Sequence, residues 1–287
     1  MPTGSCLCGV VRWEVSAPYQ WMGHCHCSMC RKHHGSLFAS NVGVDPAKFR
    51  WLEGPDAVVG YRSSQGFERA FCRHCGSVLP DTSTPTVICP AGSMPELDMK
   101  PQAHIFFASR SPSLEVTDEL PKFDEYPPGF GTAVSGKSSA ALKEGVVQGS
   151  CLCGDVAFEL DEVPTKMVNC HCSRCRISRG AAHGTNVFSK AENLRWVRGA
   201  ERVRTYKVPG AVMFGTAFCE RCGSKLPALF EKINRYLVPV GVLDTTLALK
   251  PRVHIHVASK AAWFDVTDTL PQFDAMPPRE RVGEFFY

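Results

Sequence analysis

A cluster of three cysteines within six residues occurs twice in this 287-residue chain, and it constrains the fold more than any other feature. The two stretches read HCHCSMC (residues 24–30) and NCHCSRC (residues 169–175). Other cysteines repeat with an offset of 145 to 147 residues, and the order of motifs continues to HIFFAS in the first half and HIHVAS in the second. A repeat of this length and order indicates two tandem copies of one unit.

The duplication also predicts the domain boundaries. We expect a first domain over residues 1–128 and a second over residues 147–287. Residues 129–146 are rich in Gly, Ser and Ala, which predicts a flexible linker. The two domains are called copy one and copy two. Their corresponding cysteines are, in order, Cys6, Cys8, Cys25, Cys27, Cys30, Cys72 and Cys75 in copy one and Cys151, Cys153, Cys170, Cys172, Cys175, Cys219 and Cys222 in copy two.

The pattern within each copy is mostly that of β-strands. Apolar and polar residues alternate over residues 11–15 and again over residues 156–160. HIFFAS and HIHVAS predict further strands, and RKHHGSLFA (residues 31–39) can hold only a short helical turn. We therefore expect a mainly β fold in each copy, pinned by metal.

Fifteen cysteines in a chain without an export signal point to metal or redox chemistry rather than to disulfides. The start, MPTGSCLCGV, has no basic stretch followed by an apolar run, so we expect a cytoplasmic protein. No apolar run approaches the length of a membrane helix, so a membrane partner is not expected.

Ligand counting divides the seven cysteines of each copy unequally. A structural zinc site takes four tetrahedral ligands, so seven thiols fill one such site and leave three. A C-x-C-x-x-C run can place three sulfurs on one ion, and the remaining C-x-C and C-x-x-C pairs would then close the four-thiolate site. Other pairings stay open at this point. Sulfur-rich ligand sets favour zinc, with iron as the alternative.

Three protein ligands and one open position are the coordination of catalytic zinc sites. Three thiolates make zinc a weak Lewis acid, so we expect it to hold a substrate thiolate rather than to activate water. In the alternative, a histidine closes the position and the site is structural. The candidates for this role are His24, His26, His33, His34, His171 and His183. Cys89 corresponds to Val238, which predicts a buried apolar thiol.

The combined motifs CLCG, CHCSMCR or CHCSRCR, and FCRHCGS or FCERCGS resemble the glutathione-dependent formaldehyde-activating enzyme family, which includes centromere protein V. The resemblance covers both copies. It implies tandem β-tent (Mss4-like) domains, each with one structural zinc on the C-x-C and C-x-x-C pairs and one catalytic zinc on the C-x-C-x-x-C run. It also implies carbon–sulfur bond formation between glutathione and formaldehyde.

The two copies differ where the family often shows G-x-L-D and K-x-x-W. Copy two has both motifs, ending in Asp244 and Trp263, whereas copy one has Pro95 and Ser113 at these positions. This difference makes activity in copy one doubtful. No general base stands out, and the catalytic candidates are His171, Asn186 and Arg176 near the second three-cysteine run, with Arg176 suited to a substrate carboxylate.

The leading hypothesis is a zinc-dependent carbon–sulfur lyase acting on the adduct of an aldehyde with a small thiol such as glutathione. The alternative is a non-catalytic zinc-stabilised module that binds nucleic acid or protein. Copy two carries 19 basic and 14 acidic residues, but no Lys/Arg block or aromatic stripe accompanies them, which disfavours nucleic acid. In a third hypothesis, copy one is a structural partner, and the duplication mimics a dimer of single-unit relatives.

Overall fold

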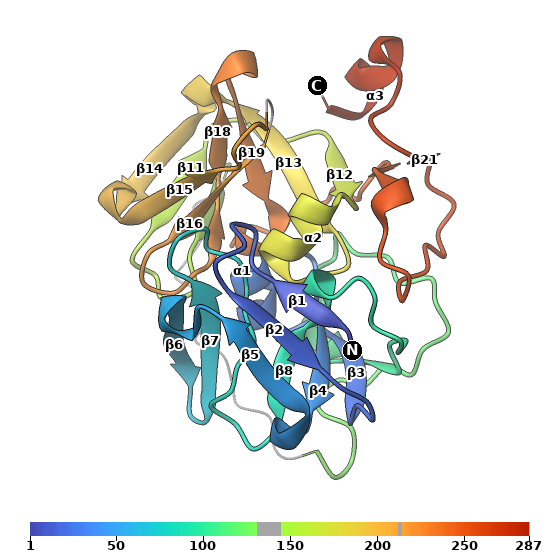
Figure 1. Ribbon diagram of the computed structural model, residues 1–287. Helices are drawn as coiled ribbons and strands as arrows, with labels where there is room; N and C mark the ends of the chain where they lie inside the picture. Colours follow the sequence, from blue (N-terminus) through green and yellow to red (C-terminus); the bar gives the residue numbers. More distant parts are fainter. Residues whose placement is uncertain (131–144, 212–213, 287) are drawn as a thin grey trace.

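Short β-strands form most of the regular structure in the computed structural model, which describes residues 1–130, 145–211 and 214–286. The mainly β fold class expected from the sequence is confirmed. Most of the predicted linker, residues 131–144, lies outside the described residues, and the exact domain boundaries stay a prediction. In Figure 1, copy one (blue to green) lies below copy two (yellow to red), with the helices α1 and α2 between the sheets of the two copies.

Copy one contains three small sheets, with strand orders β1-β2-β5, β8-β4-β3-β9 and β6-β7. All strand pairs in them are antiparallel except the parallel pair of β3 and β9. The strands are β1 (Thr3–Ser5), β2 (Arg12–Val15), β3 (Trp21–Cys25), β4 (Ala39–Val44), β5 (Phe49–Glu53), β6 (Val58–Ser64), β7 (Phe67–Cys72), β8 (Val87–Pro90) and β9 (Ala103–Ile105).

Copy two repeats this arrangement and extends it. Its sheets have the orders β10-β11-β14, β18-β19-β13-β12-β20-β21 and β15-β16-β17. The strands are β10 (Val147–Ser150), β11 (Ala157–Leu160), β12 (Met167–Cys170), β13 (Gly184–Lys190), β14 (Leu194–Arg198), β15 (Val203–Lys207), β16 (Gly215–Cys219), β17 (Lys225–Leu226), β18 (Ala228–Phe230), β19 (Arg235–Pro239), β20 (His254–Ile255) and β21 (Gln272–Phe273).

Helix occurs only in short pieces among the described residues. The helices are α1 (Ser28–His34), α2 (Ser173–Arg179) and α3 (Val282–Phe286). A cysteine caps the N-terminus of α1 and of α2, and a glycine in the left-handed conformation ends each of them, Gly35 at φ 64° and Gly180 at φ 61°. The turn expected over residues 31–39 is therefore a helix that begins three residues earlier.

Two details of the predicted strands are wrong. The strand expected over HIFFAS ends at Ile105, because Phe106 adopts the left-handed region at φ 54° and a 3-10 turn follows; His256 does the same in copy two. The alternation expected around β11 is also lost, since all four of its residues are buried. Glu159 is buried there because Arg195 from β14 forms an ion pair with it.

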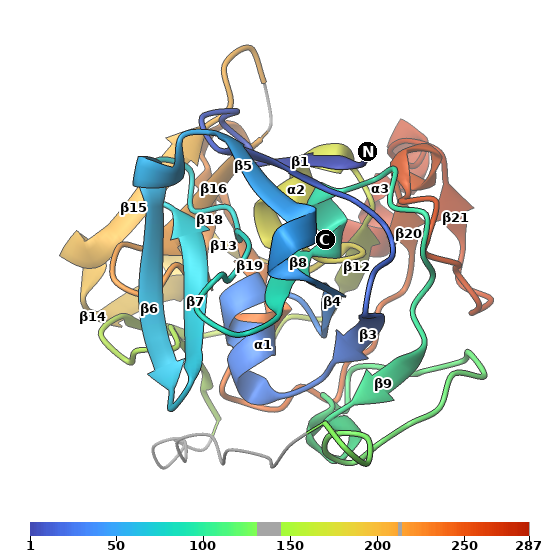
Figure 2. The same ribbon diagram turned by 60° about the horizontal axis from the view of Figure 1, so that its bottom comes forward.

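The two copies pack against each other through two equivalent contacts, each formed by the short helix of one copy and a 3-10 turn of the other. Helix α1 lies against the 3-10 turn η8 (Val240–Val242) of copy two, and α2 lies against the corresponding turn η3 (Ala91–Ser93) of copy one. One hydrophobic core cluster contains residues of both copies. Figure 2 shows α1 enclosed between the sheets of its own copy and elements of copy two.

Corresponding residues meet each other across this contact, which is the pattern of a two-fold symmetric interface. The rings of Phe71 and Phe218 are 6.2 Å apart, and the hydroxyls of Thr117 and Thr267 are 2.5 Å apart. Two exposed ion pairs are reciprocal: Lys100 with Asp265 at 2.6 Å and Lys250 with Glu115 at 2.7 Å. The chain is thus packed as an isologous dimer joined into one polypeptide, whereas a purely structural role of copy one stays a prediction.

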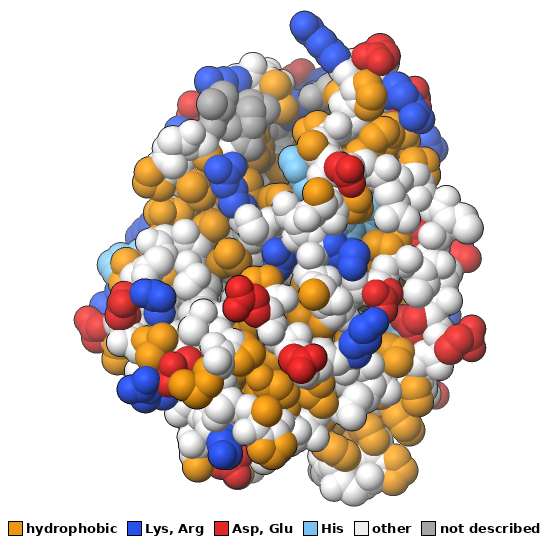
Figure 3. Space-filling view, turned by 45° about the vertical axis from the view of Figure 1, so that its right-hand side comes forward, with side chains coloured by type: hydrophobic (Ala, Val, Ile, Leu, Met, Phe, Trp, Pro, Cys, Tyr) orange, Lys and Arg blue, Asp and Glu red, His pale blue; other side chains and the backbone are white. Residues whose placement is uncertain are grey.

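The surface shows no strong segregation of charge in the view of Figure 3, where basic and acidic side chains are interspersed over one face. Within the described parts of the chain, no helix has both the length and the apolar character needed to cross a membrane.

Two glycines allow the close contact between the copies. A Cβ on Gly92 would overlap the backbone of Ala181, and a Cβ on Gly241 would overlap the carbonyl oxygen of Arg31. We therefore expect Gly92→Ala or Gly241→Ala to lower the free energy of unfolding by about 2 kcal/mol, measured by denaturant titration. Gly283→Ala is the control, since nothing lies within 4 Å of its added Cβ. Equal stability of all three variants would contradict this account of the interface.

Candidate functional site

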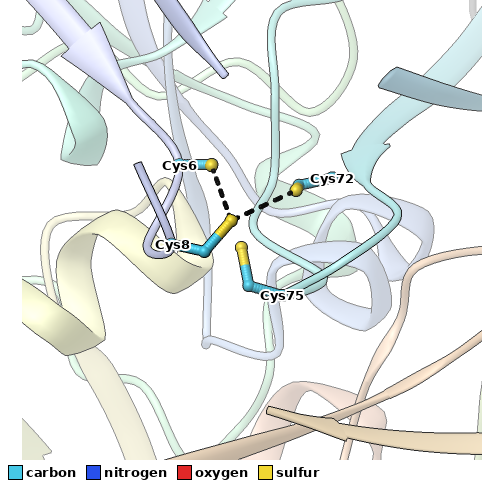
Figure 4. Close-up of side chains that lie close together, drawn as sticks. All are labelled: Cys6, Cys8, Cys72 and Cys75. Atoms are coloured by element: carbon cyan, nitrogen blue, oxygen red, sulfur yellow. Dashed lines mark hydrogen bonds between the residues drawn. The ribbon is translucent and has the colours of Figure 1, made fainter. Parts of the chain in front are cut away.

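Four cysteines of copy one converge between two turns that are far apart in the sequence (Figure 4). Cys6 and Cys8 lie in the turn between β1 and β2, whereas Cys72 ends β7 and Cys75 follows it. Their sulfur atoms all lie within 4.8 Å of one another. The Sγ atom of Cys8 is 3.3 Å from that of Cys6 and 3.8 Å from that of Cys72.

Local hydrogen bonds hold these turns together. The hydroxyl of Ser77 accepts the backbone N–H of Leu7 at 2.9 Å and lies 3.2 Å from the Cys75 sulfur, so it joins the two turns. The sequence analysis missed this serine and its counterpart Ser224, which receives the N–H of Leu152 at 2.9 Å. The sequence does point to these serines, since the pattern C-x-x-C-G-S, which ends in them, occurs in both copies.

The same cluster recurs in copy two. Its four members are Cys151, Cys153, Cys219 and Cys222, with sulfur atoms again within 4.8 Å of one another. The Cys153 sulfur lies 3.3 Å from that of Cys151 and 3.8 Å from that of Cys219.

The remaining cysteines form one three-member group in each copy. Cys25 ends β3, Cys27 caps α1 and Cys30 lies in its first turn, and their sulfurs are within 4.8 Å of one another. The Cys27 sulfur accepts the backbone N–H of Cys30 at 3.3 Å, so the helix cap itself brings these two thiols together. The corresponding group of copy two is Cys170, Cys172 and Cys175.

The donor sets suit zinc. All fifteen cysteines are free thiols, so no disulfide competes for them. Zn–S bonds of about 2.3 Å in a tetrahedron place neighbouring sulfurs about 3.8 Å apart. The contacts of Cys8 with Cys72 and of Cys153 with Cys219 have this length, and the contacts within each C-x-C pair, at 3.3 Å, are shorter. The residues present therefore fit a zinc ion in each four-cysteine cluster. Each three-cysteine cluster offers a zinc ion three sulfur ligands. Metal binding by these cysteines stays a prediction.

No histidine nitrogen joins either three-cysteine group within residues 1–130, 145–211 and 214–286. His26 and His171, each between two of the cysteines, turn instead toward the interior. Nε2 of His26 lies 2.8 Å from Nδ1 of His104, and the corresponding pair of His171 and His254 is at the same distance. Burial, together with these histidine neighbours, lowers the pKa of His26 and of His171 to about 3, so both rings are neutral near pH 7.

Sequence comparison with known proteins identifies a family. The model of the glutathione-dependent formaldehyde-activating enzyme family matches residues 1–109 and again residues 146–259. The chain belongs to this family. It is 34% identical over 106 residues to a Halomonas elongata protein named "Putative glutathione-dependent formaldehyde-activating enzyme", and the match covers 33% of this chain and 66% of that protein. A crystal structure of a Rhodobacter sphaeroides protein aligns at 26% identity, covering 36% of this chain and 97% of that one, with a TM-score of 0.31.

The three-cysteine cluster of copy one opens onto a cavity of about 740 Å³. All three cysteines line it, together with Asn41 and aromatic side chains that include Phe106 and Tyr126. Arg69 on β7 also lines the cavity, and its guanidinium donates to the Cys30 sulfur at 3.4 Å and to the Ser63 hydroxyl at 3.2 Å. In copy two the residue corresponding to Arg69 is Thr216, whose hydroxyl instead donates to the Cys75 carbonyl.

The C-terminal helix packs beside the three-cysteine cluster of copy two. Phe285 and Phe286 of α3 share a buried hydrophobic cluster with Cys170 and Cys175. Figure 1 shows α3 next to β12, the strand that ends in Cys170. The two family copies therefore differ in what surrounds their three-cysteine clusters.

The catalytic candidates near the second cluster have most of their polar groups engaged; the exception is the buried Nδ1 of His171, which has no hydrogen-bond partner among the described residues. Arg176 is 4% exposed and donates to the carbonyls of His171, Ser259 and Gly92, the last from copy one. Asn186 is buried and accepts from Arg179. Catalytic roles for His171, Asn186 and Arg176 stay a prediction.

The motif residues that distinguish the copies face the interface. Asp244 forms a 2.6 Å ion pair with Lys32 of copy one, and the indole N–H of Trp263 donates to the Met94 carbonyl of copy one at 3.3 Å. The exchanges to Pro95 and Ser113 in copy one are therefore changes at contacts between the copies. Whether the copy-one cluster is active stays a prediction.

Cys89 is fully buried in the core, as expected, and burial raises the pKa of its thiol. It joins no cysteine cluster among the described residues. This makes it a matched control for the predicted metal ligands.

We expect about four zinc ions per chain in the purified protein, because four thiol clusters fit the ion. Cys8→Ser removes one ligand of a four-cysteine cluster, so it should lower the zinc content by about one ion and the melting temperature by roughly 10 °C. Elemental analysis and thermal unfolding measure both effects.

Cys89→Ala removes a thiol of the same copy without touching a cluster, so its zinc content should equal that of the wild type. Equal zinc content in the Cys8→Ser variant and the wild type would contradict the assignment of Cys8 as a ligand.

Proposed function

We propose that the chain is a zinc-dependent carbon–sulfur lyase that forms and cleaves the adduct of a small thiol with an aldehyde, with glutathione and formaldehyde as the reference substrates. Membership of the glutathione-dependent formaldehyde-activating enzyme family supports this proposal. The reaction is placed at the three-cysteine cluster of copy one.

One observation carries this choice of site. Three sulfur atoms of copy one lie within 4.8 Å of one another and all three cysteines line a cavity of about 740 Å³. No histidine nitrogen of the described residues completes the group. A ligand from solution can therefore reach the cluster from the cavity.

A zinc ion on these three thiolates would supply one further coordination position, at which a substrate thiol is held as thiolate near neutral pH. The protein's own contribution is electrostatic and steric. Arg69 lies beside Cys30, so its positive charge offsets the negative charge that accumulates when several thiolates gather. The cavity also holds Asp124 and Glu125, which are suited to the ammonium group of a γ-glutamyl thiol.

The bond changes balance without a further reactant. The thiolate sulfur adds to the carbonyl carbon, the electron pair of the carbonyl π bond moves to oxygen, and the proton lost by the thiol ends on that oxygen. Proximity of the two reactants accounts for much of the acceleration in such an addition. The reverse sequence releases the aldehyde.

The binding-module alternative has less support. Over the face in Figure 3 basic and acidic side chains alternate without a block of one sign, whereas nucleic-acid binding rests on clustered positive charge. The cytoplasmic location expected from the sequence stays a prediction.

The test is the exchange rate between [¹³C]formaldehyde, glutathione and their adduct, measured by NMR exchange spectroscopy with zinc-loaded protein. We expect Cys27→Ser to lower the enzyme-dependent rate about ten-fold or more, because it removes a ligand of the copy-one cluster. Serine is itself a favourable helix N-cap, so α1 should persist in this variant.

Cys172→Ser is the matched control, since Cys172 caps α2 in the same way in copy two. It should keep most of the activity. A wild-type protein that does not accelerate the exchange would contradict the proposed lyase activity, and equal activity of the Cys27→Ser variant would contradict the choice of site.

A further inference from the structure

The two-fold arrangement of the copies gives two corresponding places at their interface, each built from the same repeated segments. One cleft is a cavity of about 540 Å³ between α1 of copy one and the turn around Asp244 of copy two. The corresponding place on the other side lies between α2 of copy two and the turn around Pro95 of copy one. Because both places descend from one repeat, their residues can be compared position by position.

On the second side, large and apolar residues fill the place. Trp263 is 2% exposed and donates its indole N–H to copy one. On the first side, the corresponding residue is the smaller Ser113, which lines the cavity; it is buried and its hydroxyl donates to the Leu247 carbonyl of copy two at 3.2 Å. Lys32 likewise corresponds to the uncharged Ile177. The first cleft has thus become open and polar.

The charge of the open cleft is predominantly positive. Arg31, Lys32, Arg110 and Arg198 line it, whereas Asp244 is its single acidic lining residue. Lys32 is already paired with Asp244, and it also donates to the Ser150 hydroxyl at 2.7 Å. Three positive charges therefore remain without a carboxylate of the cleft wall, although Cys151 and Cys153, which belong to a predicted four-thiolate zinc site of net negative charge, also line the cleft.

The arginine at the same position of the two helices shows the difference most clearly. In copy two, Arg176 is satisfied by three backbone carbonyls, and its Nη1 reaches Gly92 of the opposite copy at 3.1 Å. In copy one, Arg31 donates only through Nε, to the His26 carbonyl at 3.2 Å. Its two terminal nitrogens have no hydrogen-bond partner among the described residues, and Arg31 lines the cleft.

We propose that this cleft is a second binding site, which takes a small anion carrying carboxylate or phosphate groups. A planar guanidinium with free N–H groups matches the oxygens of either group, and Arg110 adds a second guanidinium at the rim. Hydroxyl groups of the wall, such as those of Ser28 and Ser111, supply neutral donors. The site does not depend on the chemistry at the three-cysteine cluster.

The experiment is calorimetric titration of the full, zinc-loaded chain with inorganic phosphate and, separately, with succinate, at an ionic strength held constant with sodium chloride. We expect one saturable site per chain for at least one of the two anions, because the opposite cleft is filled by Trp263. Binding of phosphate alone, succinate alone or both tells which oxygen group the cleft accepts.

Two variants locate the binding. Ser113→Trp places in the cleft the side chain that fills the opposite side, and it should abolish binding. Arg110→Gln removes an exposed guanidinium that stacks on Phe107 at 4.6 Å, and it should weaken binding about ten-fold.

Arg50→Gln is the control, since Arg50 is equally cationic but lies on the exposed face of β5, paired with Glu14 at 2.7 Å. This variant should bind as the wild type does. Binding of neither anion to the wild type, or equal binding by the Arg110→Gln and Arg50→Gln variants, would overturn the proposal. If the Ser113→Trp variant does not fold, the comparison of anion binding by Arg110→Gln and Arg50→Gln still tests whether the cleft is the binding site.

Discussion

The packing of each short helix against the opposite copy is the contact on which the rest of the structure depends. Cys27 and Cys30 belong to the cap and first turn of helix α1, and Cys172 and Cys175 belong to those of α2. Two cysteines of each three-cysteine cluster are therefore positioned by a helix that packs against the other copy. The helices have only seven residues each, which is too short for stability in isolation. The tandem arrangement therefore supports both clusters at once.

The two copies have different residues at several equivalent positions of the two-fold arrangement. Arg69 approaches the copy-one cluster, whereas Thr216 at the same position bonds across to copy one. Trp263 fills one interface cleft, whereas Ser113 leaves the other open. A single-unit dimer would have to keep both sides identical. Duplication within one chain removes this constraint, and one side can keep a tight interface while the other side gains a polar cavity.

The sequence predicted those features that depend on short spacing. The grouping of the cysteines follows from C-x-C and C-x-x-C pairs, since a turn or one helical turn brings such sulfurs together, and the β-rich fold follows from the alternation near Trp13. Features that depend on contacts between the copies were not predictable from local patterns. Asp244 and Trp263 were interpreted as marks of an active second copy, but they contact the first. The left-handed Phe106 was missed because bulky residues rarely adopt that conformation.

The central claim is that the copy-one three-cysteine cluster holds a metal ion with a position for a substrate thiol. The most direct measurement is ¹¹³Cd NMR of the cadmium-substituted protein during addition of glutathione, with Cys27→Ser used to assign the copy-one signal. The account predicts that this signal moves toward the position of the four-thiolate sites, because a fourth sulfur joins the ion, while the signals of the four-cysteine clusters stay in place. An unchanged copy-one signal at saturating glutathione would contradict it.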